Sequence, residues 1–182
     1  MRQESSSVYQ LRVTLKDSEP PIWRVLQVDG ETTLHELHQA LQIAIGWSDL
    51  HLHEFVIGEL HYGMSEYDSD VKDERQYRLN QLAGQVRSTL MYTYDFGDGW
   101  EHEILVESIL DAEPHIHYPR CIAGKRNCPP EDVGGIWSYK HFLNAIHDSK
   151  HPEHRNYLNW VGGAFDPEEF DLEKVNGMLG KL

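Results

Sequence analysis

The strongest constraint on the fold is a pair of alternating apolar and polar runs on either side of a Gly-Asp-Gly sequence at residues 97–99. Apolar residues recur at every second position from Leu90 to Phe96, and again from Trp100 to Val106 except that His102 takes one of these positions. A period of two indicates strands with one buried face, and a short glycine-rich connection between two such runs indicates a hairpin. We therefore expect residues 89–110 to form an antiparallel hairpin, with His102 on its apolar face.

The start of the chain carries a strand–strand–helix pattern. Apolar residues alternate with polar ones over residues 9–15, residues 22–28 form a second apolar-rich run, and turn residues separate the two. Thr33 followed by Glu36 matches a capping box, and apolar residues at helical spacing continue to Gly46, a residue type that ends helices. We expect a hairpin with a helix packed on it, which is a β-grasp-like start that other α+β folds share.

The remaining elements are expected to be short in the middle of the chain and helical near its end. Residues 50–57 predict a third strand with 60–62 as its partner, and the acidic stretch 64–75 predicts a solvated loop. Residues 111–136, rich in Pro, Gly and polar groups, predict a long loop. Helices are predicted within residues 78–86, from Ser138 to Ile146, from Pro152 to Trp160, and from Asp166 to Leu179.

Together these patterns predict the α+β class. We expect one compact domain over residues 8–182, with a mostly antiparallel or mixed sheet and with helices concentrated in the C-terminal third. A chain of 182 residues lies within the usual range of a single domain. Residues 1–7 are polar and are predicted to form a disordered tail.

Charge and composition exclude several classes of protein. The chain has 30 Asp and Glu residues against 16 Lys and Arg residues, a net charge of −14 with His neutral. A phosphate backbone repels such a protein, so general nucleic-acid binding is not expected. No apolar run approaches the ~18–20 residues of a membrane helix, the polar start is no secretory signal, and two cysteines do not make a disulfide framework. We expect a soluble, cytoplasmic protein that does not bind membranes.

The tip of the predicted hairpin gathers groups that suit metal or acid–base chemistry. Three carboxylates and one imidazole lie within eight positions: Asp95, Asp98, Glu101 and His102. If Phe96 faces Trp100 across the hairpin, then Asp95 faces Glu101, and two like charges directly opposite are destabilising unless something offsets them. The tip is therefore either a Gly-Asp-Gly turn with solvated carboxylates or a metal or ligand site.

A second candidate region follows the hairpin. Cys121 and Cys128 are separated by six residues, a wider spacing than the two to four of most paired zinc ligands. The only compact basic cluster of the chain lies around them: Arg120, Lys125 and Arg126. These cations would pair with the base-free, acidic stretch 88–119, or they would bind an anion. Glu131 and Asp132 follow in the same loop and would add carboxylates to a site.

Histidines supply further candidate ligands. The chain has 12, and His51 and His53 would project from one face of a strand. Others lie close together in sequence: His115 with His117, and His147, His151 and His154. Three protein ligands plus water would make a metal site of the catalytic type, but nothing in the sequence shows that three of these residues converge.

Several familiar catalytic motifs are absent from the sequence. It contains no Gly-x-Ser-x-Gly, no Walker loop, no His-Glu-x-x-His and no dinucleotide fingerprint. Asp95-Phe96-Gly97 does not indicate a kinase, because no glycine-rich phosphate loop and no His-Arg-Asp catalytic loop accompany it.

The chain resembles the plasmid pRiA4b Orf-3-like family, whose members are also met as passenger proteins of certain insertion sequences. The matching stretches are Leu50 to Phe55, Tyr92 to Asp98 with Trp100 and His102, Cys121 to Gly135, His151 to His154, Trp160 to Gly163, and Phe165 to Glu168. The resemblance implies one compact α+β domain and an association with mobile elements, and it implies no reaction, ligand or cofactor. Some relatives have Cys where this chain has Val133, so no ligand role is carried over to that position.

Three functions follow from these observations. The first is a binding or accessory module associated with mobile genetic elements, with a protein or small molecule as partner. The second is a metal-dependent hydrolase with a Mg²⁺, Mn²⁺ or Zn²⁺ cofactor held by the cluster at residues 95–102, with His51 or His53 and Glu131 or Asp132 as further ligands. The third is nucleic-acid binding through residues 120–126. The candidate ligand-binding residues are Asp95, Asp98, Trp100, Arg120, Lys125, Arg126, Glu131 and Asp132, and the candidate metal ligands are Asp95, Glu101, His102, Cys121 and Cys128.

Overall fold

The predicted hairpin lies at the centre of a mixed sheet. The computed structural model describes residues 7–64 and 70–182. β6 (Thr89–Tyr94) and β7 (Trp100–Asp111) pair antiparallel, and β7 also pairs along β1 (Ser7–Leu15). Within the described residues the sheet has the order β5-β4-β3-β6-β7-β1-β2-β8, and the β4–β5 pair is parallel. The prediction of one compact α+β domain with a mixed sheet is confirmed.

The other elements follow in chain order. They are β2 (Trp23–Asp29), α1 (Leu34–Ile45), β3 (His53–Ile57), β4 (Leu60–Gly63), β5 (Lys72–Asp73), the 3₁₀-helix η1 (Glu74–Gln76), α2 (Leu79–Leu82), β8 (Arg120–Lys125), α3 (Gly135–His147), α4 (His154–Trp160) and α5 (Leu172–Leu179). Among the described residues, no helix has the length and apolar character needed to cross a membrane.

The predicted strand–strand–helix start is confirmed. β1 and β2 pair antiparallel, and α1 begins at a complete capping box between Thr33 and Glu36. The helix ends at Gly46, whose φ of 114° is a left-handed conformation that favours glycine. Its buried face, which includes Leu37 and Leu41, packs on the sheet and fixes the position of the segment that follows it.

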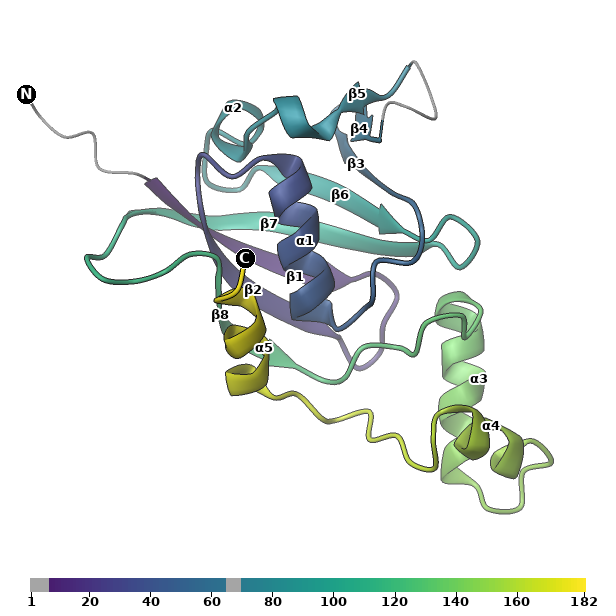
Figure 1. Cartoon of the computed structure of the whole chain (residues 1–182). Coiled ribbons are helices and arrows are strands. Elements are labelled where there is room, and N and C mark those ends of the chain that lie inside the picture. Colours follow the sequence, from purple (N-terminus) through teal and green to yellow (C-terminus); the bar gives the residue numbers. More distant parts are fainter. Residues whose placement is uncertain (1–6, 65–69) are drawn as a thin grey trace, which may run out of the picture.

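The helices form two groups around the sheet (Figure 1). α1 and α5 lie over the same face, and α5 packs against β8 and α1. α3 and α4 pack on each other and extend beyond the end of the sheet at which the β6–β7 turn lies. Phe142 of α3 contacts the rings of Tyr157 and Trp160 of α4, with ring centroids 5.3 Å and 6.1 Å away.

The structure corrects the predicted start of the last helix. Asp166 was expected to begin it, but α5 starts at Leu172 with Asp171 as its N-cap. The backbone carbonyl groups of Asp166 and Pro167 instead accept hydrogen bonds from Asn127, so this segment runs alongside the loop after β8.

The prediction of a loop over residues 111–136 is wrong for its central part. Residues 120–125 form β8, which pairs with β2, so Cys121 lies opposite Leu26. The expected basic loop is therefore largely an edge strand. It is followed by Arg126, whose φ of 72° turns the chain away from the sheet.

The prediction of a solvated loop over residues 64–75 is wrong at Glu74. This residue begins η1 and is 2% exposed, because its carboxylate is enclosed by histidines of α1 and β3. Residues 65–69 of that segment and residues 1–6 of the predicted tail lie outside the described residues, and Ser7 already belongs to β1.

Candidate functional site

The segment of residues 47–52, which joins α1 to β3, is anchored to the loop that precedes α3. Trp47 Nε1 donates a hydrogen bond to the Pro129 carbonyl oxygen at 3.0 Å. The Ser48 amide donates to Glu131 Oε2 at 3.1 Å, and Tyr94 Oη donates to the other oxygen of Glu131 at 2.7 Å. Both oxygens of the Glu131 carboxylate thus join the segment, the sheet and the loop.

The same segment is also anchored to α1 and to the hairpin tip. The Asp49 amide donates to Gln42 Oε1 at 3.0 Å, and the Leu50 amide donates to Tyr94 Oη at 2.9 Å. The Leu52 carbonyl oxygen accepts a hydrogen bond from the Asp95 amide at 2.9 Å. His51 therefore lies between fixed neighbours, which restricts where its imidazole can point.

Asp95 occupies the turn of the β6–β7 hairpin with a left-handed φ of 55°. Its Oδ1 atom accepts hydrogen bonds from the amides of Gly97 and Asp98 at 2.9 Å and 3.3 Å. These bonds close the turn with one carboxylate oxygen and leave Oδ2 directed at His51.

The register of the hairpin differs from the expected one. Tyr94 pairs with Trp100, so Thr93 faces Glu101 and the expected opposition of Asp95 and Glu101 is wrong. The loop has five residues, 95–99, and within it the Asp95 side chain accepts hydrogen bonds from the amides of Gly97 and Asp98. Glu101 pairs instead with Lys16.

The loop before α3 is locked onto this hairpin tip. Asp98 Oδ2 accepts a hydrogen bond from the Gly134 amide at 2.9 Å. A Cβ atom at Gly135 would lie 2.4 Å from the Asp98 carbonyl oxygen, so the two backbones touch there. Three residues before Gly135, Asp132 adopts a φ of 61° and extends its carboxylate toward His51.

The three segments bring His51, Asp95 and Asp132 together. His51 Nε2 lies 3.2 Å from Asp132 Oδ1 and 3.7 Å from Asp95 Oδ2. The Nε2 atom itself is buried and has no hydrogen-bond partner, although the carboxylates are so near. One ligand atom from each of the three residues lies within 4.8 Å of the other two, an arrangement that could hold a metal ion.

Comparisons with known proteins identify the family and two relatives. The family model described as "Plasmid pRiA4b ORF-3-like protein" matches residues 7–174. The chain belongs to this family. It is 34% identical over 181 residues to "Uncharacterized protein y4hQ" of Sinorhizobium fredii, covering 97% of this chain and 93% of that protein. It also matches the crystal structure of a protein of unknown function, MM3350, from Methanosarcina mazei Go1, with a TM-score of 0.84, 36% identity, and coverage of 92% of this chain and 97% of the other.

The predicted membership of the pRiA4b ORF-3-like family is thus confirmed. His51, Asp95 and Asp132 each come from a different one of the stretches on which the resemblance rested. The predicted association with mobile elements, and the predicted role as a binding or accessory module, stay predictions.

His102 is not part of the cluster of His51, Asp95 and Asp132. It is buried on the sheet, as its alternation predicted, and it packs edge-on against Trp47 with ring centroids 5.4 Å apart. Burial lowers the pKa of His102 to about 4, so the imidazole is neutral at pH 7. Trp100 is also buried and packs against Trp47, so it belongs to the core.

The cysteines and the basic cluster lie elsewhere. Cys121 is buried in β8, and burial raises the pKa of the Cys128 thiol to about 11. Within the described part of the chain, no group of three potential ligands within 4.8 Å of one another includes either cysteine. Arg120 pairs with Glu113 and Arg126 with Glu168, while Lys125 ends β8 opposite Trp23, so the two arginines of the basic cluster are used internally.

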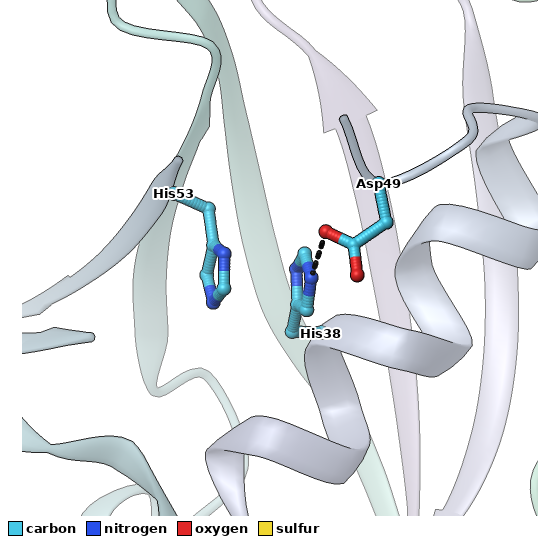
Figure 2. Close-up of side chains that lie close together, drawn as sticks. All are labelled: His38, Asp49 and His53. Carbon is cyan, nitrogen blue, oxygen red and sulfur yellow. Dashed lines mark hydrogen bonds and ion pairs between the residues drawn. The ribbon is translucent and has the colours of Figure 1, made fainter. Parts of the chain in front are cut away.

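A second group of side chains, His38, His53 and Asp49, lies between α1 and β3 (Figure 2). The rings of His38 on α1 and His53 on β3 stack with centroids 3.4 Å apart and an interplanar angle of 3°. His38 Nε2 is 2.9 Å from Asp49 Oδ1, and its Nδ1 is 2.8 Å from Tyr92 Oη. The lone pairs of an imidazole lie in its ring plane, so two parallel rings cannot both point at one ion. This network therefore holds Asp49, and with it the segment that carries His51.

Glu74 completes this network. The sequence pattern did not indicate that this residue is a buried partner of the histidines. Its Oε2 atom lies 2.7 Å from His53 Nε2, and its Oε1 atom lies 3.0 Å from His35 Nδ1. Although burial raises the pKa of Glu74, the hydrogen bonds from the histidines outweigh that effect and lower the pKa overall. No local signal distinguishes Glu74 from its acidic neighbours, because its partners come from other elements.

Proposed function

We propose that this protein is a metal-dependent hydrolase that holds a divalent ion with His51 Nε2, Asp95 Oδ2 and Asp132 Oδ1. The observation that carries this proposal is the buried Nε2 atom, which lies 3.2 Å and 3.7 Å from two carboxylate oxygens without a hydrogen bond to either. Ligand atoms around a tetrahedral ion, with bonds of about 2.0–2.2 Å, lie about 3.3–3.6 Å apart. The two distances are close to this value, so little movement would be needed to bind an ion.

The donor set narrows the choice of ion. One imidazole and two carboxylates suit Zn²⁺, Mn²⁺ or Fe²⁺ better than Mg²⁺ or Ca²⁺, which prefer oxygen alone. Three protein ligands leave at least one position for water, and a bound ion lowers the pKa of that water enough to make a nucleophile near neutral pH. The net charge of −14 also favours a cation over an anionic ligand at this site.

The surroundings support a preorganised site. Glu131 uses both carboxylate oxygens, and Asp95 uses one, to fix the loops, which leaves Asp95 Oδ2 and Asp132 for the ion. Ligands held by such outer hydrogen bonds lose little conformational freedom when they bind a metal.

Metal binding is tested by isothermal titration of the full chain, purified without chelator, with Zn²⁺, Mn²⁺ and Mg²⁺. We expect one site that takes Zn²⁺ or Mn²⁺ more tightly than Mg²⁺, and we expect His51→Ala and Asp132→Asn to weaken it at least tenfold. Glu173→Gln on the exposed surface of α5 is the matched control, since it removes the same charge as Asp132→Asn. If Glu173→Gln weakens binding as much as Asp132→Asn does, or if His51→Ala leaves binding unchanged, the ion is not held at this site and the proposal is overturned.

Hydrolysis is tested separately with p-nitrophenyl acetate and bis(p-nitrophenyl) phosphate as general ester and phosphodiester probes. We expect the metal-loaded protein to hydrolyse at least one of them and His51→Ala to abolish that activity. A protein that binds the ion at this site but hydrolyses neither probe would keep the metal site and lose the hydrolase assignment.

A further inference from the structure

A groove of about 350 Å³ opens beside the Asp132 carboxylate, between the loop before α3 and helix α4. It is lined by Asp132, Val133, Glu153, Asn156, Tyr157 and Trp160. The volume lies in the range of small-molecule sites, which begins at about 300 Å³. Asp132 belongs both to this groove and to the proposed metal site, so the groove borders the place where Asp132 would hold an ion.

The polar groups of the groove select against anionic ligands. None of its six lining residues is a Lys, Arg or His, so nothing there would neutralise an anion. Of its two carboxylates, Glu153 already bonds His141 at 2.7 Å, and Asp132 would be neutralised by the ion. With the metal bound, the groove offers Asn156 as a neutral hydrogen-bonding group next to an apolar wall.

Trp160 and Tyr157 are the aromatic residues of that wall. The Trp160 side chain is 47% exposed, yet its ring is held edge-on by Phe142 and Tyr157 at centroid distances of 6.1 Å and 6.4 Å. An indole held in this way is a fixed aromatic surface, and planar rings gain from stacking on it beyond the area that they bury.

We propose that this groove binds the aromatic part of a neutral substrate whose carbonyl-type oxygen coordinates the metal ion. The proposal rests on the metal site described above and adds the substrate class: an aromatic acyl compound, with its ring on Trp160 and Tyr157 and its oxygen at the open position of the ion.

The probes are acetohydroxamate and benzohydroxamate, which share the metal-chelating group and differ in the aromatic ring. Each is titrated calorimetrically into the zinc-loaded full chain, with zinc content measured before and after. We expect benzohydroxamate to bind at least about tenfold more tightly, from ring burial and stacking. Equal affinities for a zinc-loaded protein would overturn the inference and leave the metal site intact, whereas failure to load zinc would overturn the proposed function itself.

Two tryptophan variants locate the ring. Trp160→Ala should remove the preference for benzohydroxamate while leaving zinc and acetohydroxamate affinity within about twofold. Trp137→Ala, which removes a 75% exposed tryptophan that does not line the groove, should keep the preference. A preference that survives Trp160→Ala would place the ring elsewhere and overturn the inference.

A third probe separates this substrate class from a cation site. Benzylamine carries the ring and a positive charge but no chelating group. We expect it to bind neither the metal-free nor the zinc-loaded chain measurably. If benzylamine binds the metal-free protein as tightly as benzohydroxamate binds the loaded one, the groove recognises organic cations and the inference is wrong.

Discussion

Gly135 lies so close to Asp98 that a Cβ atom at position 135 would be 2.4 Å from the Asp98 carbonyl oxygen. The contact joins the loop that carries Asp132 to the hairpin tip that carries Asp95. Gly135 also has a left-handed φ of 80°, so two independent reasons require glycine there. The pair therefore sets the distance between two of the three proposed metal ligands.

Gly135→Ala is expected to destabilise the protein by about 2–4 kcal/mol, because left-handed strain and steric overlap with fixed backbone add together. It is also expected to weaken metal binding at least tenfold, since the Asp132 loop must move away from the hairpin. Urea unfolding and metal titration measure the two effects.

Gly162→Ala is the matched control for this change. Gly162 has a similar φ of 83°, but a Cβ atom there would meet nothing within 4 Å. It should lose only the strain contribution, about 1–2 kcal/mol, with unchanged metal affinity. Equal effects of the two variants would show that the contact with Asp98 has no separate role.

Tyr94→Phe tests whether the anchored segment positions His51. The Tyr94 hydroxyl accepts from the Leu50 amide and donates to Glu131, so its removal breaks the link between segment and loop. We expect a stability loss of about 1–2 kcal/mol and a clear loss of metal affinity, although Tyr94 is not a proposed ligand. Tyr9→Phe in β1, near Gly30, should leave metal affinity unchanged. Unchanged affinity in Tyr94→Phe would contradict the positioning role.

Local patterns were sufficient for the parts of the fold that depend on neighbours in sequence. The alternation over residues 89–110 predicted the hairpin, and the Thr33–Glu36 pair predicted the start of α1. The hairpin register was not predictable in this way, because the Asp95 side chain closes a five-residue loop where a three-residue turn was expected. A side chain that competes with backbone hydrogen bonds leaves no mark in the alternation.

The residue types of the candidate site could be predicted from the sequence, but which individual residues form it could not. Asp95 was expected as a ligand, and His51 and Asp132 were among several possible contributors. Glu101 and His102 were expected beside Asp95, yet Glu101 pairs with Lys16 and His102 is buried in the core. Which side chains converge depends on contacts between distant segments, and only the packed structure supplies these.

His102→Leu tests the cost of a buried, neutral imidazole. The pKa of His102 is about 4 in the folded protein, below the value of about 6.5 expected when unfolded. The unfolded chain thus takes up a proton first as pH falls, and the free energy of unfolding should decrease by about 1.4 kcal/mol per pH unit between about pH 6.5 and 4 from this group.

In His102→Leu this contribution disappears, so the loss of stability on acidification should be smaller than in the parent. At pH 7 the change in stability should stay within about 1 kcal/mol, because the ring nitrogens of His102 have no well-aligned hydrogen bond to lose. Urea unfolding at several pH values measures both, with His61→Leu at an exposed position as control. An unchanged pH dependence in His102→Leu would contradict the assignment.

Arg24→Met tests a buried cation that lies at the C-terminal end of α1. Arg24 is 3% exposed. Its guanidinium donates hydrogen bonds to the carbonyl oxygens of Ala44, Lys125 and Arg126 at 2.7 Å, 3.0 Å and 2.8 Å. Methionine keeps the apolar stem but leaves these acceptors without a donor, so we expect a loss of about 2–4 kcal/mol in urea unfolding. Arg12→Met removes a half-exposed arginine that pairs with Glu107 and should lose less than about 1 kcal/mol. Similar losses in the two variants would mean that the helix-end carbonyls gain little from Arg24.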